Sequence, residues 1–396
     1  MLLDVTLGRE RSYRTNFVAP GVLYLVKGGY MYLKKIELKN FRNYDEEAVE
    51  FHDKVNIITG KNAQGKTNLL ESLYIMSLGK SFRTSKDTEM IGFDKEFCRA
   101  KSTSVKDGRD LEIEITIGKE GKVTKINGLK TAKNIDLLEN VYMVIFSPED
   151  LKIVKDEPEK RRKFIDRELC QLKPMYYRNL GRYKKILQQR NSLLRQQEVK
   201  EDVIAVWDES LAEYGAKIIL ERNRFVSKLN EISCRISRGI TNEKESLEIS
   251  YEANIEVKEN YEEQKNHFKA QLSKSLKSDI QRRSTSAGPH KDDLKLCVDG
   301  IDIRHFGSQG QQRTAALSLK LAEIQLIKEE ASVSPILLLD DVLSELDAER
   351  QNFLINSLGE VQLFITTAEL GEEVRKQLPE GYTFFVEHGQ VKKKEE

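Results

Sequence analysis

The sequence predicts an α/β fold whose head domain carries an antiparallel β-subdomain and is split by an inserted helical arm. Three observations support this prediction. A G-x-x-x-x-G-K-T loop at 60–67 lies between an apolar strand and a helix, an apolar strand at 335–341 ends in two carboxylates, and long polar helical stretches lie between the two motifs. Lys66 and Asp340 are 274 residues apart. Because a compact phosphate-loop domain does not need that distance, we expect the insertion to divide the head.

The loop at 60–67 has the pattern of a phosphate-binding loop of the P-loop type. An apolar strand at 55–59 precedes it, and a helix predicted over 67–78 follows and stops at Gly79. Glycines let successive backbone N–H groups face an anion, while a lysine adds a point charge and a threonine hydroxyl can ligate Mg²⁺. We therefore expect the following residues to bind a nucleotide: Gly60, Lys61, Asn62, Ala63, Gln64, Gly65, Lys66 and Thr67.

The strand at 335–341 resembles the Walker B segment that completes such a site. We predict that Asp340 holds Mg²⁺ together with Thr67, and that Asp341 orients the attacking water. Asp341 and Lys66 are thus the predicted catalytic residues, and ATP with Mg²⁺ is the predicted cofactor.

A second phosphate-binding element lies at 307–313, where it opens a helix predicted over 314–330. A serine, a glycine and free N–H groups at a helix N-terminus form an anion site. The residues that we assign to it are Ser308, Gln309, Gly310 and Gln311. Because one chain then carries two phosphate-binding elements and its own loop occupies one, we expect the second to close on a nucleotide held by another copy, which predicts an ATP-dependent homodimer.

Composition places limits on the class of protein. The chain has 396 residues, with 65 Lys and Arg against 64 Asp and Glu, so a surface that binds polyanions must be a local patch. The four cysteines are far apart, which favours reduced thiols over a disulfide framework or a zinc site. No apolar run approaches the length of a membrane span, and we predict a cytoplasmic protein.

Domain boundaries follow from changes in character along the chain. Residues 1–30 show no clear periodicity, and Met31 offers a second start after a stretch compatible with a bacterial ribosome-binding sequence, so these residues are either a mis-called leader or a disordered extension. Residues 31–157 are predicted to form the N-terminal lobe of the head, with a β-meander punctuated by Asp-Gly and Asn-Gly turns. Residues 158–280 are the predicted helical arm and 281–396 the C-terminal lobe of the head.

These motifs together resemble the ATP-binding-cassette ATPases of the SMC and DNA-repair branch. Within that branch, seven stretches from Met31 to the C-terminus resemble the RecF family of bacterial recombination mediators in order and spacing: 40–44, 60–68, 80–84, 146–151, 288–293, 308–313 and 337–347. Residues 1–30 have no counterpart in the resemblance, which favours the leader explanation. Lys291 stands where an arginine is common in the family. Thr366 and Thr367 stand where the wider class usually has a switch histidine, and the family also lacks that histidine.

The resemblance implies an ATP-driven dimer that binds duplex DNA or single-strand/double-strand junctions. It also implies work with RecO and RecR, loading of RecA at gaps and support of the SOS response. It makes Arg42 a nucleotide contact and Asp347 the D-loop aspartate. Lys80 and Arg83, in a basic and aromatic turn beside the phosphate loop, are the predicted DNA contacts.

Two other functions share part of this motif set. The nucleotide-binding subunit of a membrane transporter has the same loop, signature and Walker B strand, but it does not explain a helical arm of more than a hundred residues between them. A structural cohesion protein of the SMC type would need a longer arm. Binding of gapped DNA with and without ATP distinguishes the three functions.

Overall fold

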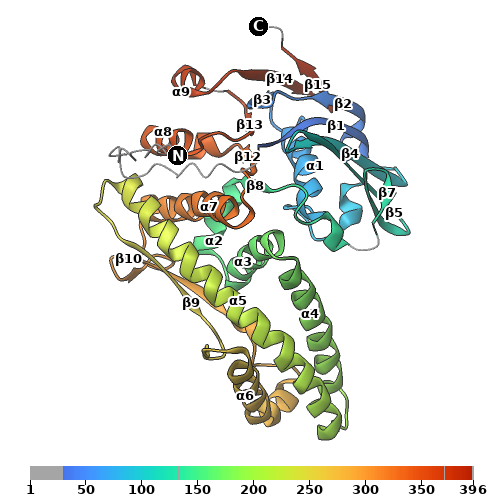
Figure 1. Ribbon diagram of the computed structural model, residues 1–396, viewed down its shortest axis with the longest axis vertical. Helices are drawn as coiled ribbons and strands as arrows, with labels where there is room; N and C mark the ends of the chain where they lie inside the picture. The colour runs from blue at the N-terminus through green and yellow to red at the C-terminus, as the bar shows by residue number, and fades with distance from the viewer. Residues whose placement is uncertain (1–29, 132–133, 370, 395–396) are drawn as a thin grey trace, which may run out of the picture.

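The computed structural model describes residues 30–131, 134–369 and 371–394 (Figure 1). It shows a head built around two sheets and an arm of long helices that extends from the head (Figure 1). The fold is therefore a mixed α/β head with parallel and antiparallel sheets and a helical insertion, as the sequence predicts.

The central sheet of the head takes strands from both ends of the chain. Its order is β15-β14-β3-β13-β12-β8, and all neighbouring strands except the β14/β15 pair are parallel. The strands are β3 (Val55–Thr59), β8 (Met143–Phe146), β12 (Ile336–Asp340), β13 (Leu363–Thr367), β14 (Gly381–Glu387) and β15 (Gln390–Lys393). β8 and β12 are buried throughout, which is typical of parallel strands covered on both faces. The head is thus completed only when the chain returns from the arm.

The second sheet of the head is antiparallel, with the order β2-β1-β4-β5-β6-β7. Its strands are β1 (Met31–Phe41), β2 (Tyr44–Glu50), β4 (Phe97–Lys106), β5 (Arg109–Gly118), β6 (Gly121–Ile126) and β7 (Leu129–Lys130). Both residues of the Asp107-Gly108 and Asn127-Gly128 turns have positive φ, as tight hairpins of this kind require. The predicted β-meander is confirmed.

Helix α1 (Lys66–Leu78) connects the two sheets. Eleven of its residues are buried, and it contacts β12 and β13 of the central sheet as well as β1, β4 and β5 of the antiparallel sheet. It ends at Gly79, whose φ of 64° places it in the left-handed region that favours glycine. The helix that carries Lys66 and Thr67 is therefore fixed on both sides.

The arm consists of α3 (Pro158–Leu172), α4 (Pro174–Leu194), α5 (Glu201–Thr241) and α6 (Tyr261–Arg282). The 41 residues of α5 span about 60 Å at the usual helical rise. α5 packs against α4 and α6 in the arm and against α7 (Gln309–Ala331) in the head (Figure 1). One continuous helix thus connects the arm to the helix that follows the second phosphate-binding element.

Two features differ from the sequence prediction or were missed by it. Helix α7 begins at Gln309, five residues before the predicted start, because the Ser308 hydroxyl caps it and accepts a hydrogen bond from the backbone of Gln311. A three-stranded sheet of β9 (Leu247–Glu252), β10 (Asp293–Val298) and β11 (Ile301–Asp302) pairs residues from both sides of position 280. Because this sheet includes strands from both sides of position 280, we propose that the boundary near 280 divides the sequence but does not separate two independently folded parts.

Short segments complete the chain. The α-helices are α2 (Leu151–Lys155), α8 (Ala348–Ser357) and α9 (Glu372–Gln377), and the 3₁₀ segments are η1 (Asp87–Met90), η2 (Asn134–Leu137), η3 (Pro148–Asp150), η4 (Pro289–Lys291) and η5 (Val342–Glu345). Among the described residues, no helix is long and apolar enough to cross a bilayer. Residues 1–29 of the predicted leader or extension lie outside the described residues.

The stretch at 288–293 contacts helices α4 and α5 of the arm and strand β9. Asp292 accepts hydrogen bonds from Arg222 of α5 and from the Tyr251 hydroxyl of β9. The imidazole of His290 contacts the Tyr183 hydroxyl at 2.7 Å and the Thr285 carbonyl at 3.0 Å. Burial lowers the pKa of His290 to about 4. These contacts give the stretch a structural role.

Candidate nucleotide site

The phosphate loop runs from the end of β3 at Thr59 to the start of α1 at Lys66. Gly60 has a φ of 143°, and a Cβ at this position would lie 2.3 Å from the carbonyl oxygen of Val386. Gly65 has a φ of 122°, and a Cβ there would lie 2.7 Å from the Asn43 side chain. Neither position accommodates a larger residue, so the curled backbone depends on both glycines.

Lys66 turns back toward its own loop. Its ammonium group donates hydrogen bonds to the carbonyl oxygens of Gly60 at 2.8 Å and Lys61 at 3.2 Å, and the residue is only 5% exposed. The positive charge is thus placed at the mouth of the loop and away from bulk water, where an anion gains most from it.

The end of β12 lies beside this loop, as the sequence predicts. The Thr67 hydroxyl donates a hydrogen bond to one carboxylate oxygen of Asp340 at 2.9 Å, and the Thr366 hydroxyl donates to the same oxygen at 2.8 Å. Burial raises the pKa of Asp340, and the two hydroxyl hydrogen bonds oppose that rise. A hydroxyl and a carboxylate side by side are oxygen ligands suited to Mg²⁺.

Asp341 has a strained backbone, with a φ of 53°. Its N–H donates to the Thr366 hydroxyl at 3.0 Å and to the Thr366 carbonyl at 3.2 Å. Thr366 therefore connects the two predicted carboxylates, accepting a hydrogen bond from the backbone of one and donating to the side chain of the other. The neighbouring Thr367 hydroxyl donates to the carbonyl of Glu369 at 2.6 Å.

Residues of two turns brace the phosphate loop, and their roles were not assigned from the sequence. The Asn43 amide donates to the carbonyl of Gln64 at 2.9 Å, and the Tyr44 hydroxyl donates to the carbonyl of Gly65 at 2.9 Å. From the β14/β15 turn, the backbone N–H of His388 donates to the Gln64 side chain at 2.8 Å. The only sequence signal for the first pair was the 40–44 stretch of the family resemblance.

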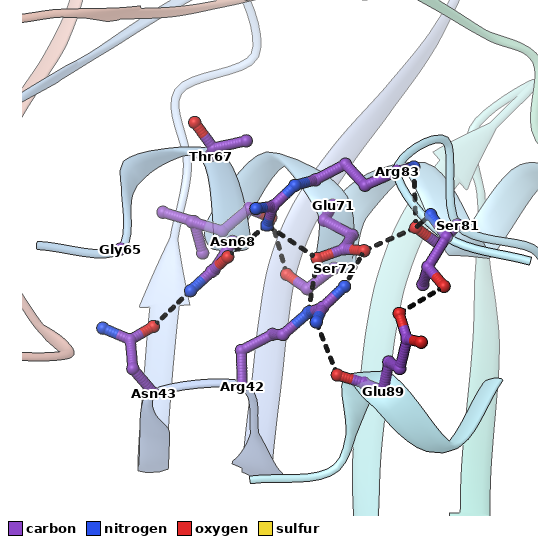
Figure 2. Close-up of polar contacts among 12 residues, drawn as sticks. Arg42, Asn43, Gly65, Thr67, Asn68, Glu71, Ser72, Ser81, Arg83 and Glu89 are labelled. Atoms are coloured by element: carbon purple, nitrogen blue, oxygen red, sulfur yellow. Dashed lines mark hydrogen bonds and ion pairs between the residues drawn. The ribbon is translucent and has the colours of Figure 1, made fainter. Parts of the chain in front are cut away.

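Arg42, predicted as a nucleotide contact, is engaged within the protein. Its guanidinium donates to both carboxylate oxygens of Glu71, at 2.8 and 2.7 Å, and to the backbone carbonyl of Glu89 (Figure 2). Arg83, predicted as a DNA contact, donates to Asn68 at 2.6 Å and to Glu71 at 3.3 Å (Figure 2). The structure thus brings these two arginines together at Glu71 of helix α1.

Lys80, the other predicted DNA contact, lies at the end of the same helix. Its ammonium group is 5.6 Å from the centre of the Tyr177 ring in α4. Lys80 is exposed, so this cation–π contact is of the weak kind found at protein surfaces, and the charge stays accessible to solvent.

The second phosphate-binding element forms a capping box at the start of α7. The Ser308 hydroxyl accepts a hydrogen bond from the N–H of Gln311 at 3.1 Å, and the Gln311 side chain accepts one from the N–H of Ser308 at 3.0 Å. The Gln311 amide also donates to Glu245 at 3.1 Å. The described side-chain hydrogen bonds of Ser308 and Gln311 therefore go to one another and to Glu245, and not to the phosphate loop of the same chain.

Arg350, which sequence reasoning missed, ties this element to the predicted D-loop. Its guanidinium donates to the Gly310 carbonyl at 3.2 Å, to the Thr314 hydroxyl and to the Asp347 carboxylate. The backbone N–H of Arg350 also bonds Asp347 and lowers the pKa of that carboxyl. The second phosphate-binding element at the start of α7 and the predicted D-loop therefore form one hydrogen-bonded unit.

The comparisons with known proteins agree with this geometry. Residues 32–378 match the family model described as RecF/RecN/SMC N terminal domain, so the chain has an ATP-binding-cassette-type head of the SMC kind. The DNA replication and repair protein RecF of Alkaliphilus oremlandii is 45% identical over 91% of this chain and 100% of its own length. The chain belongs to the RecF family.

Solved structures support the same assignment. One, described as the recombination mediator protein RecF-ATPrS in the RecFOR pathway, has a TM-score of 0.86 at 39% identity and covers 93% of this chain and 99% of its own. Another, described as RecF-ATP in the same pathway, has a TM-score of 0.85 at 41% identity and covers 92% of this chain and 98% of its own.

Proposed function

We propose that this chain is an ATP-dependent DNA-binding protein of recombinational gap repair and replication-fork maintenance, in which slow ATP hydrolysis acts as a switch. The observation that carries the proposal is the hydrogen bond between Thr67 and Asp340 beside Lys66. It forms in a head whose central sheet is completed only by strands that follow the arm in sequence. The names of the similar proteins support the same repair process.

The residues of the site fit ATP and Mg²⁺. Lys66 would exchange its two carbonyl contacts for the β- and γ-phosphates, and Thr67 and Asp340 would hold the metal. Bound Mg²⁺ would neutralise part of the phosphate charge. Such an ion would take one carboxylate, one hydroxyl, water and phosphate oxygens as ligands. In the described residues no group of three or more His, Cys, Asp and Glu side chains could hold a metal ion. Asp341 would orient the attacking water.

The second copy would complete the site. At the start of α7, Gln309 and Gly310 would offer N–H groups and Ser308 its hydroxyl proton, while Gln311 holds Ser308 in the capping box and Arg350 holds Asp347 beside them. Since the described hydrogen bonds of this unit do not reach its own phosphate loop, its proposed ligand is the γ-phosphate bound by a partner copy. ATP would thereby drive formation of a homodimer.

DNA is the proposed macromolecular ligand, either as duplex or at single-strand/double-strand junctions. Lys80 and Arg83 are the proposed phosphate contacts, which would give a strong salt dependence and little base specificity. RecR and RecO are the proposed protein partners, with RecA loaded indirectly, in the cytoplasm and in support of the SOS response. The RecFOR pathway named for the similar structures supports this choice of partners.

A mobility-shift experiment with gapped duplex, together with size-exclusion chromatography, tests the proposal. We expect a dimer and a DNA complex with Mg²⁺-ATP, and a monomer with weaker DNA binding without it. A protein that stays monomeric with saturating ATP, or that binds no DNA in either state, would contradict the proposal.

A further inference from the structure

Two arginines of the head share one buried carboxylate. Glu71 lies on α1 one turn after Thr67, is fully buried, and receives Arg42 through two short hydrogen bonds. Arg83 reaches the same carboxylate through a single contact of 3.3 Å, and the Ser81 hydroxyl donates to it at 2.5 Å (Figure 2). Two guanidinium groups thus contact one carboxylate beside the phosphate loop.

The two ion pairs differ in strength. The side chain of Arg42 is 19% exposed and forms the two-pronged geometry that is strongest between guanidinium and carboxylate. The side chain of Arg83 is 41% exposed and contributes one long bond, which is typical of a weak surface ion pair. If Arg83 departed, Glu71 would keep Arg42 and Ser81, so no buried charge would be left without a partner. Arg83 can therefore leave at little cost, whereas Arg42 cannot.

A second contact of Arg83 leads back to the phosphate loop. Its guanidinium donates to the side-chain oxygen of Asn68, and the Asn68 amide donates to Asn43 at 2.7 Å. Asn43 in turn donates to the carbonyl of Gln64 in the loop. A continuous chain of hydrogen bonds through two amide side chains therefore joins Gln64 of the loop to Arg83.

We propose that Arg83 is a phosphate-binding guanidinium that Glu71 and Asn68 hold against α1 until a phosphate competes for it. This inference rests on the proposed function, and it adds that Glu71 is a positioning residue that sets the affinity of Arg83 for its ligand. Phosphate is the ligand because a guanidinium fork matches phosphate as it matches carboxylate, and because Arg42 already pairs with the carboxylate that Arg83 contacts. The phosphate can belong to the nucleotide or to the DNA backbone.

The test measures the binding of two separate probes. A fluorescent ATP analogue with Mg²⁺ is titrated without DNA, and gapped duplex is titrated without nucleotide. Replacing Glu71 with glutamine should tighten binding of at least one probe about two- to fivefold, the range that corresponds to a partly exposed ion pair. Arg83→Ala should weaken binding of the same probe, and Glu71→Gln should have no effect in the Arg83→Ala background.

Controls keep the inference falsifiable if the buried substitution affects folding. The pair Arg42→Gln with Glu71→Gln removes both charges of the strong ion pair, so it leaves no unpaired buried charge and should show the same gain. Lys86 lies in the same loop but pairs with Glu89, so the gain should persist in a Lys86→Ala background.

The outcomes separate the sources of phosphate. A gain with the ATP analogue alone assigns Arg83 to the nucleotide, and a gain with DNA alone assigns it to the DNA backbone. No gain with either probe in any Glu71 variant, or a gain that persists without Arg83, would overturn the inference. Failure of the wild-type protein to bind DNA would instead contradict the proposed function, and the ATP titration would still test the role of Glu71.

Discussion

The hydroxyl of Thr67 lies 2.9 Å from a carboxylate oxygen of Asp340, although 273 residues separate the two in sequence. The contact exists because β13 pairs with β3 on one side and with β12 on the other, so the ends of all three strands meet at one edge of the sheet. The candidate metal site therefore depends on the chain returning correctly from the arm. A protein that folds its arm wrongly should lose nucleotide binding even with an intact phosphate loop.

Lys66→Ala should weaken ATP binding at least about 100-fold, because charge-assisted hydrogen bonds to the phosphates are worth roughly 1.5–3 kcal/mol each. Titration calorimetry with Mg²⁺-ATP measures the loss. Lys61→Ala, at an exposed position of the same loop, is the matched control and should lose much less. Equal losses in the two variants would contradict the assignment of Lys66.

Asp341→Asn should bind ATP within about twofold of the wild type but hydrolyse it at least about 100-fold more slowly. The carboxylate orients water in the transition state and adds little to ground-state affinity. Its backbone contacts to Thr366 would remain, since the substitution changes only the side chain. Unchanged turnover in single-turnover assays would show that another group positions the water.

Ser308→Arg should leave ATP binding by the monomer intact and prevent ATP-driven dimerisation, because a large side chain would fill the space for the partner's γ-phosphate. Loss of the helix cap should also lower the free energy of unfolding by about 1 kcal/mol. Size-exclusion chromatography with a slowly hydrolysed analogue decides the question. Ser273→Arg, at an exposed serine of α6, should dimerise normally. A dimer formed by Ser308→Arg would contradict the role in trans.

Protonation of His290 should destabilise the protein at acidic pH. Since the Thr285 carbonyl can only accept, Nε2 carries the proton of the neutral ring and Nδ1 accepts from Tyr183. The pKa is about 4 in the folded state and about 6.5 unfolded, so the unfolded state takes up a proton first as pH falls below 6.5. The resulting loss in the free energy of unfolding is absent above pH 6.5 and amounts to about 2 kcal/mol at pH 5.

Urea unfolding at pH 7.5 and pH 5.0 measures this effect for the wild type and His290→Gln. The variant can be less stable at both values, but its loss of stability between them should be smaller than that of the wild type by about 2 kcal/mol. An identical loss in both proteins would show that His290 does not titrate as the burial of its ring predicts.

The sequence predicted the parts of the site that have short, spaced motifs. The phosphate loop requires glycines at 60 and 65 and a lysine at 66 independently of the rest of the fold. An apolar strand that ends in Asp340 likewise forms a recognisable local pattern. The pairing of Thr67 with Asp340 followed once both were assigned to one nucleotide. The β-meander was predictable because its turns carry Asp-Gly and Asn-Gly pairs.

Other features depend on tertiary contacts that no local pattern records. Glu71 looks like a surface position of a helix, yet it is buried because Arg42 and Arg83 come from loops that fold over it. Arg350 lies 40 residues from Gly310, and nothing in its own neighbourhood indicates that contact. The early start of α7 was missed because Gly310 weakens the helix signal after Ser308, and the capping box overrides that weakness.

Thr366 bears on the rate of hydrolysis. Its hydroxyl is already occupied by Asp340 and by the backbone of Asp341, and it cannot carry a positive charge as an imidazolium can. Charge that develops on the γ-phosphate would therefore be stabilised mainly by Lys66, Mg²⁺ and the partner copy. Turnover should be slow, and it should require the dimer.

The ATPase rate per subunit, measured against protein concentration with and without gapped duplex, tests this account most directly. We predict a slow rate that rises with concentration until the dimer saturates, and that DNA shifts this rise to lower concentration by favouring the closed dimer. A fast rate that depends on neither protein concentration nor DNA would mean that the monomer is the catalyst, and it would contradict the proposed switch.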